Sequence, residues 1–158
     1  MSLTTHRLSI DAPADLIFSM LKDSAHWPYL DGLTVYAERV NGDGSNHELR
    51  TSVVANGSLS SSSCHRAFDA ARQRAEFRQL DLEAPFVALG GEWEIHRAGG
   101  LSVVTLHHEY ELDDDTEDLA EQVNQTIDEF SRRELHALKV SSERVIQLLQ
   151  QYSAAREV

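Results

Sequence analysis

A chain of 158 residues has the length of one domain and can bury a sizeable hydrophobic core. Its formal charge of −12 argues against nucleic acid and anionic membranes as partners, because both are bound mainly through lysine and arginine. No apolar run approaches the roughly 20 residues of a membrane-spanning helix, and no basic segment followed by an apolar one opens the chain, so we expect neither a membrane span nor a secretory signal. Cys64 is the only cysteine, which permits no disulfide within the chain and indicates a reducing, cytoplasmic location.

The hydrophobic pattern predicts one strand, two short helices, six strands and one long helix, in that order. The first strand spans residues 3–10. Pro13, with an aspartate on either side, marks the start of a helix that ends near Lys22, and Ser24 begins a second short helix that stops before Pro28. Six strands are predicted over residues 33–40, 48–55, 59–69, 74–80, 91–97 and 101–112, and several of them are joined by Asn-Gly or glycine-rich turns, which are typical of antiparallel hairpins. The acidic run 113–118 favours the start of a long helix that reaches about Tyr152, with a frayed tail after it.

This order of elements indicates an α+β fold in a single domain, residues 1–158. We expect a curved, seven-stranded antiparallel sheet wrapped around the long C-terminal helix, with two short helices after the first strand. Such a sheet leaves a cavity between itself and the helix.

No motif for a metal or a nucleotide occurs: the chain lacks C-x-x-C, H-E-x-x-H, Walker-type and G-x-G-x-x-G patterns. The adjacent His107 and His108 point to opposite faces of a strand and cannot bind one metal ion together. We therefore expect no metal and no cofactor. Cys64 could act as a nucleophile, but nothing in the sequence marks it as activated.

Two ionisable residues share the parity of buried neighbours on their strands. Side chains of a strand alternate between its two faces, and in residues 103–112 one face would carry Val104, Leu106, His108, Tyr110 and Leu112. This places His108 on the apolar face and His107 in water. Arg66 lies on the same face of its predicted strand as Cys64 and Phe68. Both side chains should therefore point into the interior.

The long helix supplies a third ionisable residue at an apolar position. Glu134 falls within the stripe Val123, Ile127, Phe130 and Leu138. Burial of a cation, an imidazole and a carboxylate is costly unless they pair with each other or with a ligand. Arg66, His108 and Glu134 therefore predict an interior polar site, while a plain buried ion pair and a satisfied core histidine stay open as alternatives.

Several short segments along the chain form a recognisable set: Ala12-Pro13-Ala14-Asp15-Leu16-Ile17, Trp27-Pro28, Cys64-His65-Arg66, Phe77-Arg78-Gln79-Leu80, Pro85, Gly91-Glu92-Trp93, His108-Glu109-Tyr110 and Ser131-Arg132-Arg133-Glu134-Leu135. With these segments the chain resembles, along nearly its whole length, the bacterial aromatic polyketide aromatase/cyclases, and its element order resembles their Bet v 1-like or START-like helix-grip fold. Glutamate stands at position 134 where members that use the histidine have an aspartate, and Cys64 stands where a serine is usual. Thr34 falls near a position where some members have a tyrosine.

This resemblance implies an enzyme that folds a poly-β-ketone tethered to an acyl carrier protein, closes its first ring by an aldol reaction and dehydrates that ring. Arg66 would stabilise the enolate or alkoxide, His108 would transfer protons near neutral pH, and Glu134 would orient His108 or act as the base. Substrate contacts are expected from Trp27, Ser62, Cys64, Phe68, Phe77, Phe86, Trp93 and Tyr110.

The implied partners are the acyl carrier protein and the other components of a type II polyketide synthase. Because carrier proteins are usually acidic, docking would need a local basic patch, for which Arg72, Arg74 and Arg78 are candidates. The alternative function is a non-enzymatic START-like carrier of a lipid or quinone, and a third is a protein-interaction module of the co-chaperone type.

Overall fold

The computed structural model describes residues 1–23, 34–55, 57–114 and 116–156. Seven strands and two helices are formed by these residues. Their bounds are β1 Ser2–Ile10, α1 Ala14–Lys22, β2 Thr34–Gly42, β3 Asn46–Ala55, β4 Ser58–Asp69, β5 Arg74–Gln79, β6 Phe86–Ala98, β7 Leu101–Leu112 and α3 Glu117–Arg156. Neither described helix is long and apolar enough to cross a membrane.

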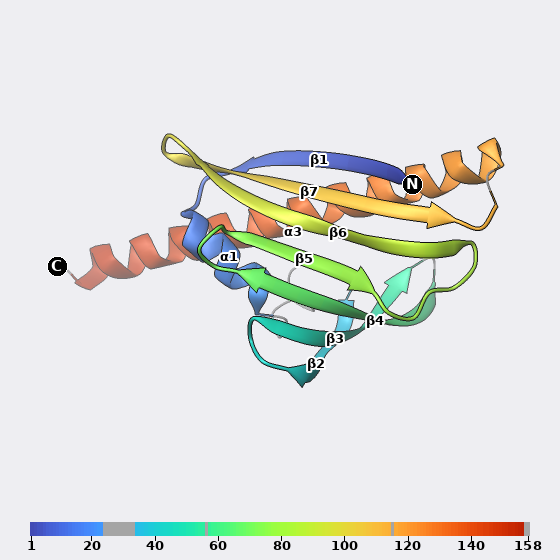
Figure 1. The fold of residues 1–158 in the computed structure, drawn as a ribbon. Coiled ribbons are helices and arrows are strands. Elements are labelled where there is room, and N and C mark those ends of the chain that lie inside the picture. The colour runs from blue at the N-terminus through green and yellow to red at the C-terminus, as the bar shows by residue number, and fades with distance from the viewer. Residues whose placement is uncertain (24–33, 56, 115, 157–158) are drawn as a thin grey trace.

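The seven strands form one antiparallel sheet in the order β1-β7-β6-β5-β4-β3-β2. Strands β2 to β7 pair with their neighbours in the chain, and β1 forms one edge of the sheet, where it pairs with β7. Helix α3 runs behind the sheet beside β1 and β7, and α1 lies next to it (Figure 1). The predicted curved sheet on a long helix is therefore confirmed.

The main hydrophobic core lies between the inner face of the sheet, α1 and α3. On β7 the inner face carries the buried residues Val104, Leu106, His108 and Tyr110, as the alternation of side chains predicts. Ser102 at the start of this strand is also buried, and its hydroxyl donates to the carbonyl oxygen of Ala12 at 2.7 Å. That bond fixes the chain just before α1 against β7.

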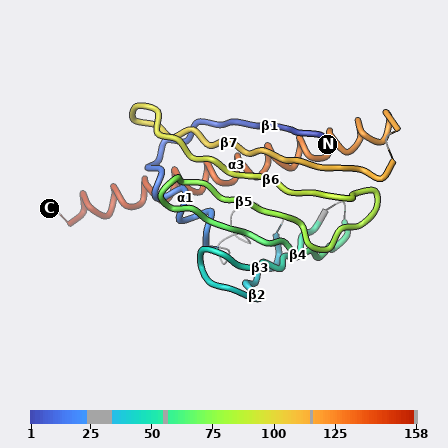
Figure 2. The backbone as a smooth tube through the Cα atoms, in the orientation of Figure 1, coloured from blue at the N-terminus to red at the C-terminus, as the bar shows by residue number. Residues whose placement is uncertain are grey.

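Two predicted boundaries differ from the structure by four or more residues. Strand β6 begins at Phe86 rather than at 91, because residues 86–90 pair with β7 even though Gly90 and Gly91 interrupt the alternation. Helix α3 continues to Arg156, through a segment without proline or glycine that includes residues of good helix propensity, so the predicted frayed tail is wrong for residues 153–156. The backbone tube shows this end of α3 extending beyond the sheet (Figure 2). The second short helix was predicted within residues 24–33, which lie outside the described residues.

Gly91 is required where β5 and β6 pair. A Cβ atom at this position would lie 2.5 Å from Cζ of Phe77 and would collide with the carbonyl oxygen of His107. The absence of a side chain lets the Phe77 ring lie across Gly91, where its centroid is 5.2 Å from that of the His108 ring. This glycine therefore shapes the surroundings of His108.

We expect Gly91→Ala to lower the free energy of unfolding by about 1–3 kcal/mol, because the methyl group collides with the backbone carbonyl oxygen of His107 and with the ring of Phe77. Gly100→Ala is the matched control: a Cβ atom there meets nothing within 4 Å, and its effect should stay within about 0.5 kcal/mol. Urea denaturation of both variants measures the difference. Equal stabilities would show that the Phe77 ring moves freely at this position.

Candidate active site between the sheet and the long helix

Arg66, His108 and Glu134 all line one interior cavity of about 160 Å³. They come from β4, β7 and α3, and are 8%, 5% and 6% exposed respectively. Among the described residues, the apolar part of the wall is formed largely by Leu21, Leu49, Phe68, Phe77, Trp93 and Leu106. The structure thus places the three predicted ionisable residues around the same mainly apolar space.

Arg66 is held by neutral acceptors. Its Nε donates to Nε2 of His47 at 3.1 Å, and one Nη atom donates to the carbonyl oxygens of Leu21 at 3.3 Å and Lys22 at 2.9 Å. The guanidinium also lies 4.6 Å above the ring of Phe68. The two carbonyls are at the C-terminal end of α1, where a cation is favoured.

The bonds to described residues use only part of the Arg66 guanidinium. A guanidinium has five N–H groups, and the hydrogen bonds above use those of Nε and one Nη atom. The second Nη atom makes no hydrogen bond to the described residues. Burial lowers the pKa of Arg66 to about 10, opposed in part by Cys64 and Asp23, so the side chain stays positive at neutral pH.

His47 on β3 is a site residue that the sequence analysis missed. It is buried, its ring stacks on Phe68 with centroids 5.7 Å apart, and its Nδ1 lies 2.9 Å from the carbonyl oxygen of Asp43. A carbonyl accepts, so Nδ1 carries the proton and Nε2 accepts from Arg66. Burial and the charge of Arg66 lower the pKa of His47, which agrees with this neutral form.

His108 is bonded to a second residue that the sequence analysis missed, Ser131 of α3. The Nδ1 atom of His108 is 3.1 Å from the hydroxyl oxygen of Ser131, which is fully buried. The rings of Phe77 and Phe130 approach His108 edge-on, with centroids 5.2 and 6.2 Å away. The hydrogen bond of His108 is therefore made with Ser131 and not with Glu134.

Burial also determines the charge of His108. Loss of solvent, helped by the nearby His6, lowers the pKa of His108 from 6.5 to about 4. His108 is therefore neutral at pH 7 and does not titrate near neutrality as the sequence analysis expected. In this state it can accept a proton at Nε2 while Nδ1 is bonded to Ser131.

The low pKa of His108 predicts a pH-dependent stability. Between pH 6.5 and 4 the unfolded chain binds a proton at this residue and the folded chain does not, so stability is lost as the pH falls through that range. The loss from His108 should reach about 3 kcal/mol. Denaturation curves of wild type and His108→Asn at pH 4 and pH 7 measure it, with His96→Asn on the sheet surface as the control. An identical pH dependence in all three proteins would contradict the prediction.

The predicted substrate contacts are placed as follows. Cys64, Phe68, Phe77 and Trp93 line the cavity. Phe86 and Tyr110 pack together beside it in a second cluster with Val123 and Ile127, their ring centroids 6.3 Å apart. Ser62 lies 3.4 Å from the hydroxyl of Thr51 on β3 and is not among the lining residues, and Trp27 lies outside the described residues.

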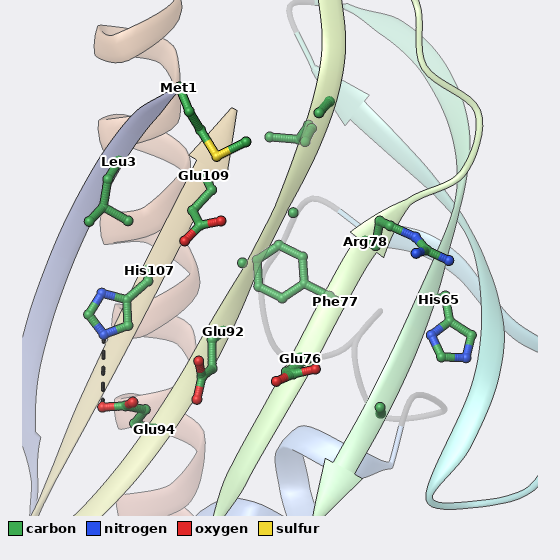
Figure 3. Close-up of a pocket in the computed structure, with 15 residues that line it drawn as sticks. Met1, Leu3, His65, Glu76, Phe77, Arg78, Glu92, Glu94, His107 and Glu109 are labelled. Carbon is green, nitrogen blue, oxygen red and sulfur yellow. Dashed lines mark ion pairs between the residues drawn. The ribbon is translucent and has the colours of Figure 1, made fainter. Parts of the chain in front are cut away.

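A larger hollow, of about 740 Å³, lies on the outer face of the sheet and is strongly acidic (Figure 3). It contains no group of three or more histidine, cysteine or carboxylate side chains suited to a metal ion, nor does any other part of the described chain. We place the candidate site in the smaller interior cavity, because the buried ionisable residues gather there. The ionisable residues that line the outer hollow are His65, Glu76, Arg78, Glu92, Glu94, His107 and Glu109.

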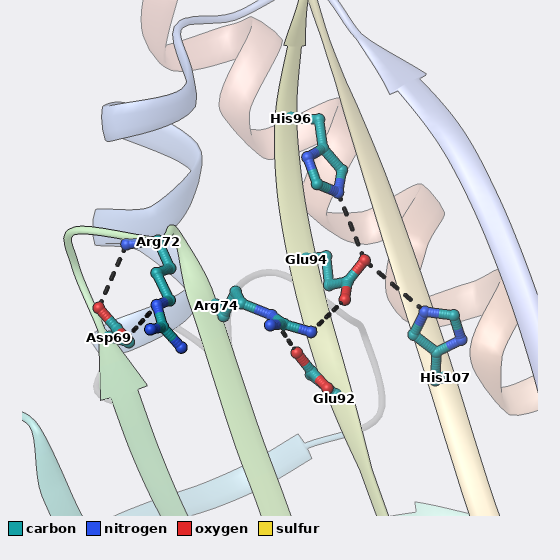
Figure 4. A network of polar contacts seen from close by, with 7 residues as sticks. All are labelled: Asp69, Arg72, Arg74, Glu92, Glu94, His96 and His107. Carbon is teal, nitrogen blue, oxygen red and sulfur yellow. Dashed lines mark hydrogen bonds and ion pairs between the residues drawn. The ribbon is translucent and has the colours of Figure 1, made fainter.

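The arginines proposed for carrier docking lie on or near this outer face. Arg74 is paired with Glu92 and Glu94, and Arg72 lies 3.7 Å from Asp69 (Figure 4). Glu94 in turn binds His96 and His107, so this part of the surface is a network of paired charges. Arg74 is therefore not available to an acidic partner, and the three arginines do not form an open basic patch.

The sheet and the long helix form a START-like helix-grip fold, and solved structures bear this fold out. The Zhui aromatase/cyclase from Streptomyces superposes with a TM-score of 0.83 at 20% identity, over 92% of this chain and 95% of that one. The di-domain aromatase/cyclase BexL gives a TM-score of 0.80 at 28% identity, over 88% of this chain and 45% of that one.

Sequence comparison leads to the same class of proteins. The granaticin polyketide synthase bifunctional cyclase/dehydratase of Streptomyces violaceoruber is 24% identical over 139 residues, which cover 87% of this chain and 43% of the relative. This chain thus spans about half the length of the curated relatives it matches. No protein-family model matches it. The chain therefore has a START-like helix-grip fold and is similar in sequence and structure to bacterial polyketide cyclase/dehydratases and aromatase/cyclases.

Proposed function

We propose that this protein is a polyketide aromatase/cyclase that needs no cofactor. It binds a poly-β-ketone carried by an acyl carrier protein, closes the first ring by an intramolecular aldol reaction and dehydrates that ring. The observation that carries the proposal is the gathering of Arg66, His108 and Glu134 around one largely apolar cavity. A dry cavity that holds one conformer suits a substrate for which several ring closures compete in water.

The chemistry follows from the state of each side chain. Neutral His108 accepts a proton from a methylene group between two carbonyls, and the resulting enolate carbon attacks a ketone carbon further along the chain. The unused N–H groups of Arg66 donate to the oxygen on which negative charge develops. Loss of a second proton from carbon, and of the new hydroxyl group as water, then forms the aromatic ring. Glu134, on the opposite wall, is placed to exchange protons with the same intermediate.

The size of the cavity indicates which part of the substrate it holds. About 160 Å³ is close to the volume of cavities that bind one benzene ring, about 150 Å³. The described cavity therefore suits the segment that becomes the first ring, and the remainder of the ketide and its carrier would lie outside it. This agrees with a first-ring cyclase that acts together with a type II polyketide synthase.

A second candidate function is the binding of a hydrophobic ligand without chemistry. The largely apolar wall favours it, as does the use of Arg66 to tie α1 to β3 and β4. In a carrier of this kind, the second Nη atom of Arg66 would hold a ligand carbonyl or carboxylate.

Reconstitution with a minimal polyketide synthase and its acyl carrier protein separates the two functions. A cyclase should shift the products from spontaneously cyclised ketides to one compound with a regiospecific aromatic first ring. Glu134→Gln, which keeps the size of the side chain, is the matched variant and should return the profile toward the spontaneous mixture. An unchanged profile with wild-type protein, together with tight binding of an aromatic ligand, would establish the carrier instead.

A further inference from the structure

Helix α3 changes the sign of its charge along its length. Residues 117–129 contain five carboxylates and no lysine or arginine, whereas residues 130–156 contain five cations and two carboxylates. Of those two carboxylates, Glu134 lines the cavity, and Glu143 is paired with Lys139 at 2.7 Å. The second part of α3 is therefore positive toward solvent, in a chain whose formal charge is −12.

Three arginines in this part of α3 are available to a partner. Arg132, Arg133 and Arg144 are exposed, and none of them forms an ion pair or a hydrogen bond with another residue that the structure describes. Among the exposed carboxylates of α3, Glu129 comes closest to them in the sequence, one turn before Arg133. Arginine is also enriched among the residues that contribute most to protein interfaces.

The arginines belong to one continuous surface of the helix. Arg133, His136, Val140 and Arg144 are exposed and lie on one face of α3, because steps of three and four residues return to the same side of a helix. At a rise of about 1.5 Å per residue, Arg133 and Arg144 are about 16 Å apart along the axis. Between them Val140 is 53% exposed. We call this surface, with Arg132 at its edge, the basic face of α3.

The basic face adjoins the boundary between the interior cavity and solvent. Phe130 lines the cavity, with its ring 6.2 Å from that of His108, and is nevertheless 44% exposed. Arg133 follows one turn later, about 4.5 Å further along the axis. The next residue, Glu134, lines the cavity again. A partner bound to the basic face is therefore next to the cavity.

We propose that the basic face of α3 is the docking surface for the acyl carrier protein that delivers the ketide. This inference rests on the proposed function, in which the substrate is bound to a carrier. Carrier proteins are usually acidic, and this chain has a net charge of −12, so the two proteins repel each other except at a local positive surface. Arg133 and Arg144 pair with carboxylates of the carrier, and Val140 supplies an apolar contact between them. The tethered ketide enters past Phe130.

Charge reversal on the basic face tests this docking surface. The probe is the unloaded acyl carrier protein of the reconstituted synthase, labelled for fluorescence anisotropy, so that binding is measured without chemistry. Arg133→Glu combined with Arg144→Glu should weaken binding by roughly tenfold or more, since like charges then face each other. Raising the ionic strength from about 0.05 M to about 0.5 M should weaken binding of the wild type much more than binding of the double variant.

Arg78→Glu is the matched control for Arg133→Glu. It makes the same change of charge at an exposed arginine, but on the outer face of the sheet. Arg133→Glu alone should weaken binding severalfold, while Arg78→Glu should bind the carrier like the wild type. Glu129→Gln removes the carboxylate nearest to the basic face and should strengthen binding. All these side chains are exposed, so the melting temperatures should stay close to that of the wild type.

Turnover separates docking from chemistry. In the double variant, KM for the carrier-bound ketide should rise while kcat and the binding of a free aromatic ligand keep their wild-type values. Wild-type carrier binding by the double variant, or equal weakening by Arg78→Glu, would overturn the docking surface even where the wild type cyclises the ketide. A wild type that binds the carrier through this face and cyclises nothing would remove the proposed function and keep the docking surface. Phosphatidylglycerol vesicles that bind the face as tightly as the carrier does would overturn the assignment to a carrier.

Discussion

Replacement of Arg66 by alanine should reduce the yield of first-ring product by on the order of a hundredfold, the effect of losing a donor to a developing oxyanion. The same change should also lower stability, because His47 and the carbonyls of Leu21 and Lys22 lose their donor. Product yield in the reconstituted synthase must therefore be expressed per folded protein, with the folded fraction taken from a denaturation curve.

Two variants separate the chemical role of Arg66 from its structural one. Arg66→Lys keeps the positive charge but loses the planar guanidinium with its parallel N–H donors, so it should retain more activity than Arg66→Ala but less than the wild type. His47→Gln removes one acceptor of Arg66 and leaves the guanidinium in place, so it should lower stability more than turnover. A folded Arg66→Ala protein with the wild-type product profile would remove Arg66 from the chemistry.

His108→Asn and Glu134→Gln should each lower turnover by about a hundredfold and leave the binding of a product-like aromatic ligand nearly intact. The double variant should lose little more than the worse single variant, because both residues act on the same proton transfers. The structure gives His108 a direct hydrogen bond to Ser131, and we expect the coupling between His108 and Glu134 to arise through the substrate on which both act. Turnover and melting temperature of the three proteins measure the effect.

Ser131→Ala is the matched control for that pair, since it removes the partner of His108 and leaves both ionisable groups in place. It should cause a smaller loss than either single variant. Strictly additive losses of turnover, or a loss of stability with wild-type turnover per folded protein, would show that His108 and Glu134 do not share a catalytic step. The ligand carrier would then be the better account.

The inward placement of the three central residues could be predicted because strands and helices have fixed periods. The alternation of apolar and polar residues in 103–112 predicted that His108 is buried, and the same alternation on β4 predicted the burial of Arg66. Both predictions are confirmed. The helical period likewise predicted the burial of Glu134, although it placed Phe130 in the same stripe. Phe130 does face the cavity and lies 6.2 Å from the His108 ring, centroid to centroid, but it remains 44% exposed, and Ser131 is the fully buried residue beside it.

The residues that hold the site gave weaker signals. Ser131 carries no hydrophobic signal, and its burial follows from the close approach of α3 to His108. His47 lies on the same face of β3 as Leu49 and Thr51. The predicted strand began at residue 48 and so left His47 out, since polar residues next to a glycine-rich turn usually end a strand. Its burial depends on Arg66, which lies opposite it in the pairing of β3 with β4. Such partners become visible only once the strand register is known.

The central claim is that ring closure takes place inside the cavity between the sheet and α3, and filling that cavity tests it most directly. Cys64 lines the cavity and is half-buried, and its replacement keeps the three proposed catalytic side chains, Arg66, His108 and Glu134. Cys64→Phe should add bulk at a stability cost of about 1–3 kcal/mol, while Cys64→Ser keeps the volume. The measurement is the product profile of both variants in the reconstituted synthase, per folded protein. We predict that Cys64→Ser yields the wild-type first-ring product and that Cys64→Phe yields only the spontaneous mixture; a folded Cys64→Phe protein that still gives the wild-type product would contradict the account.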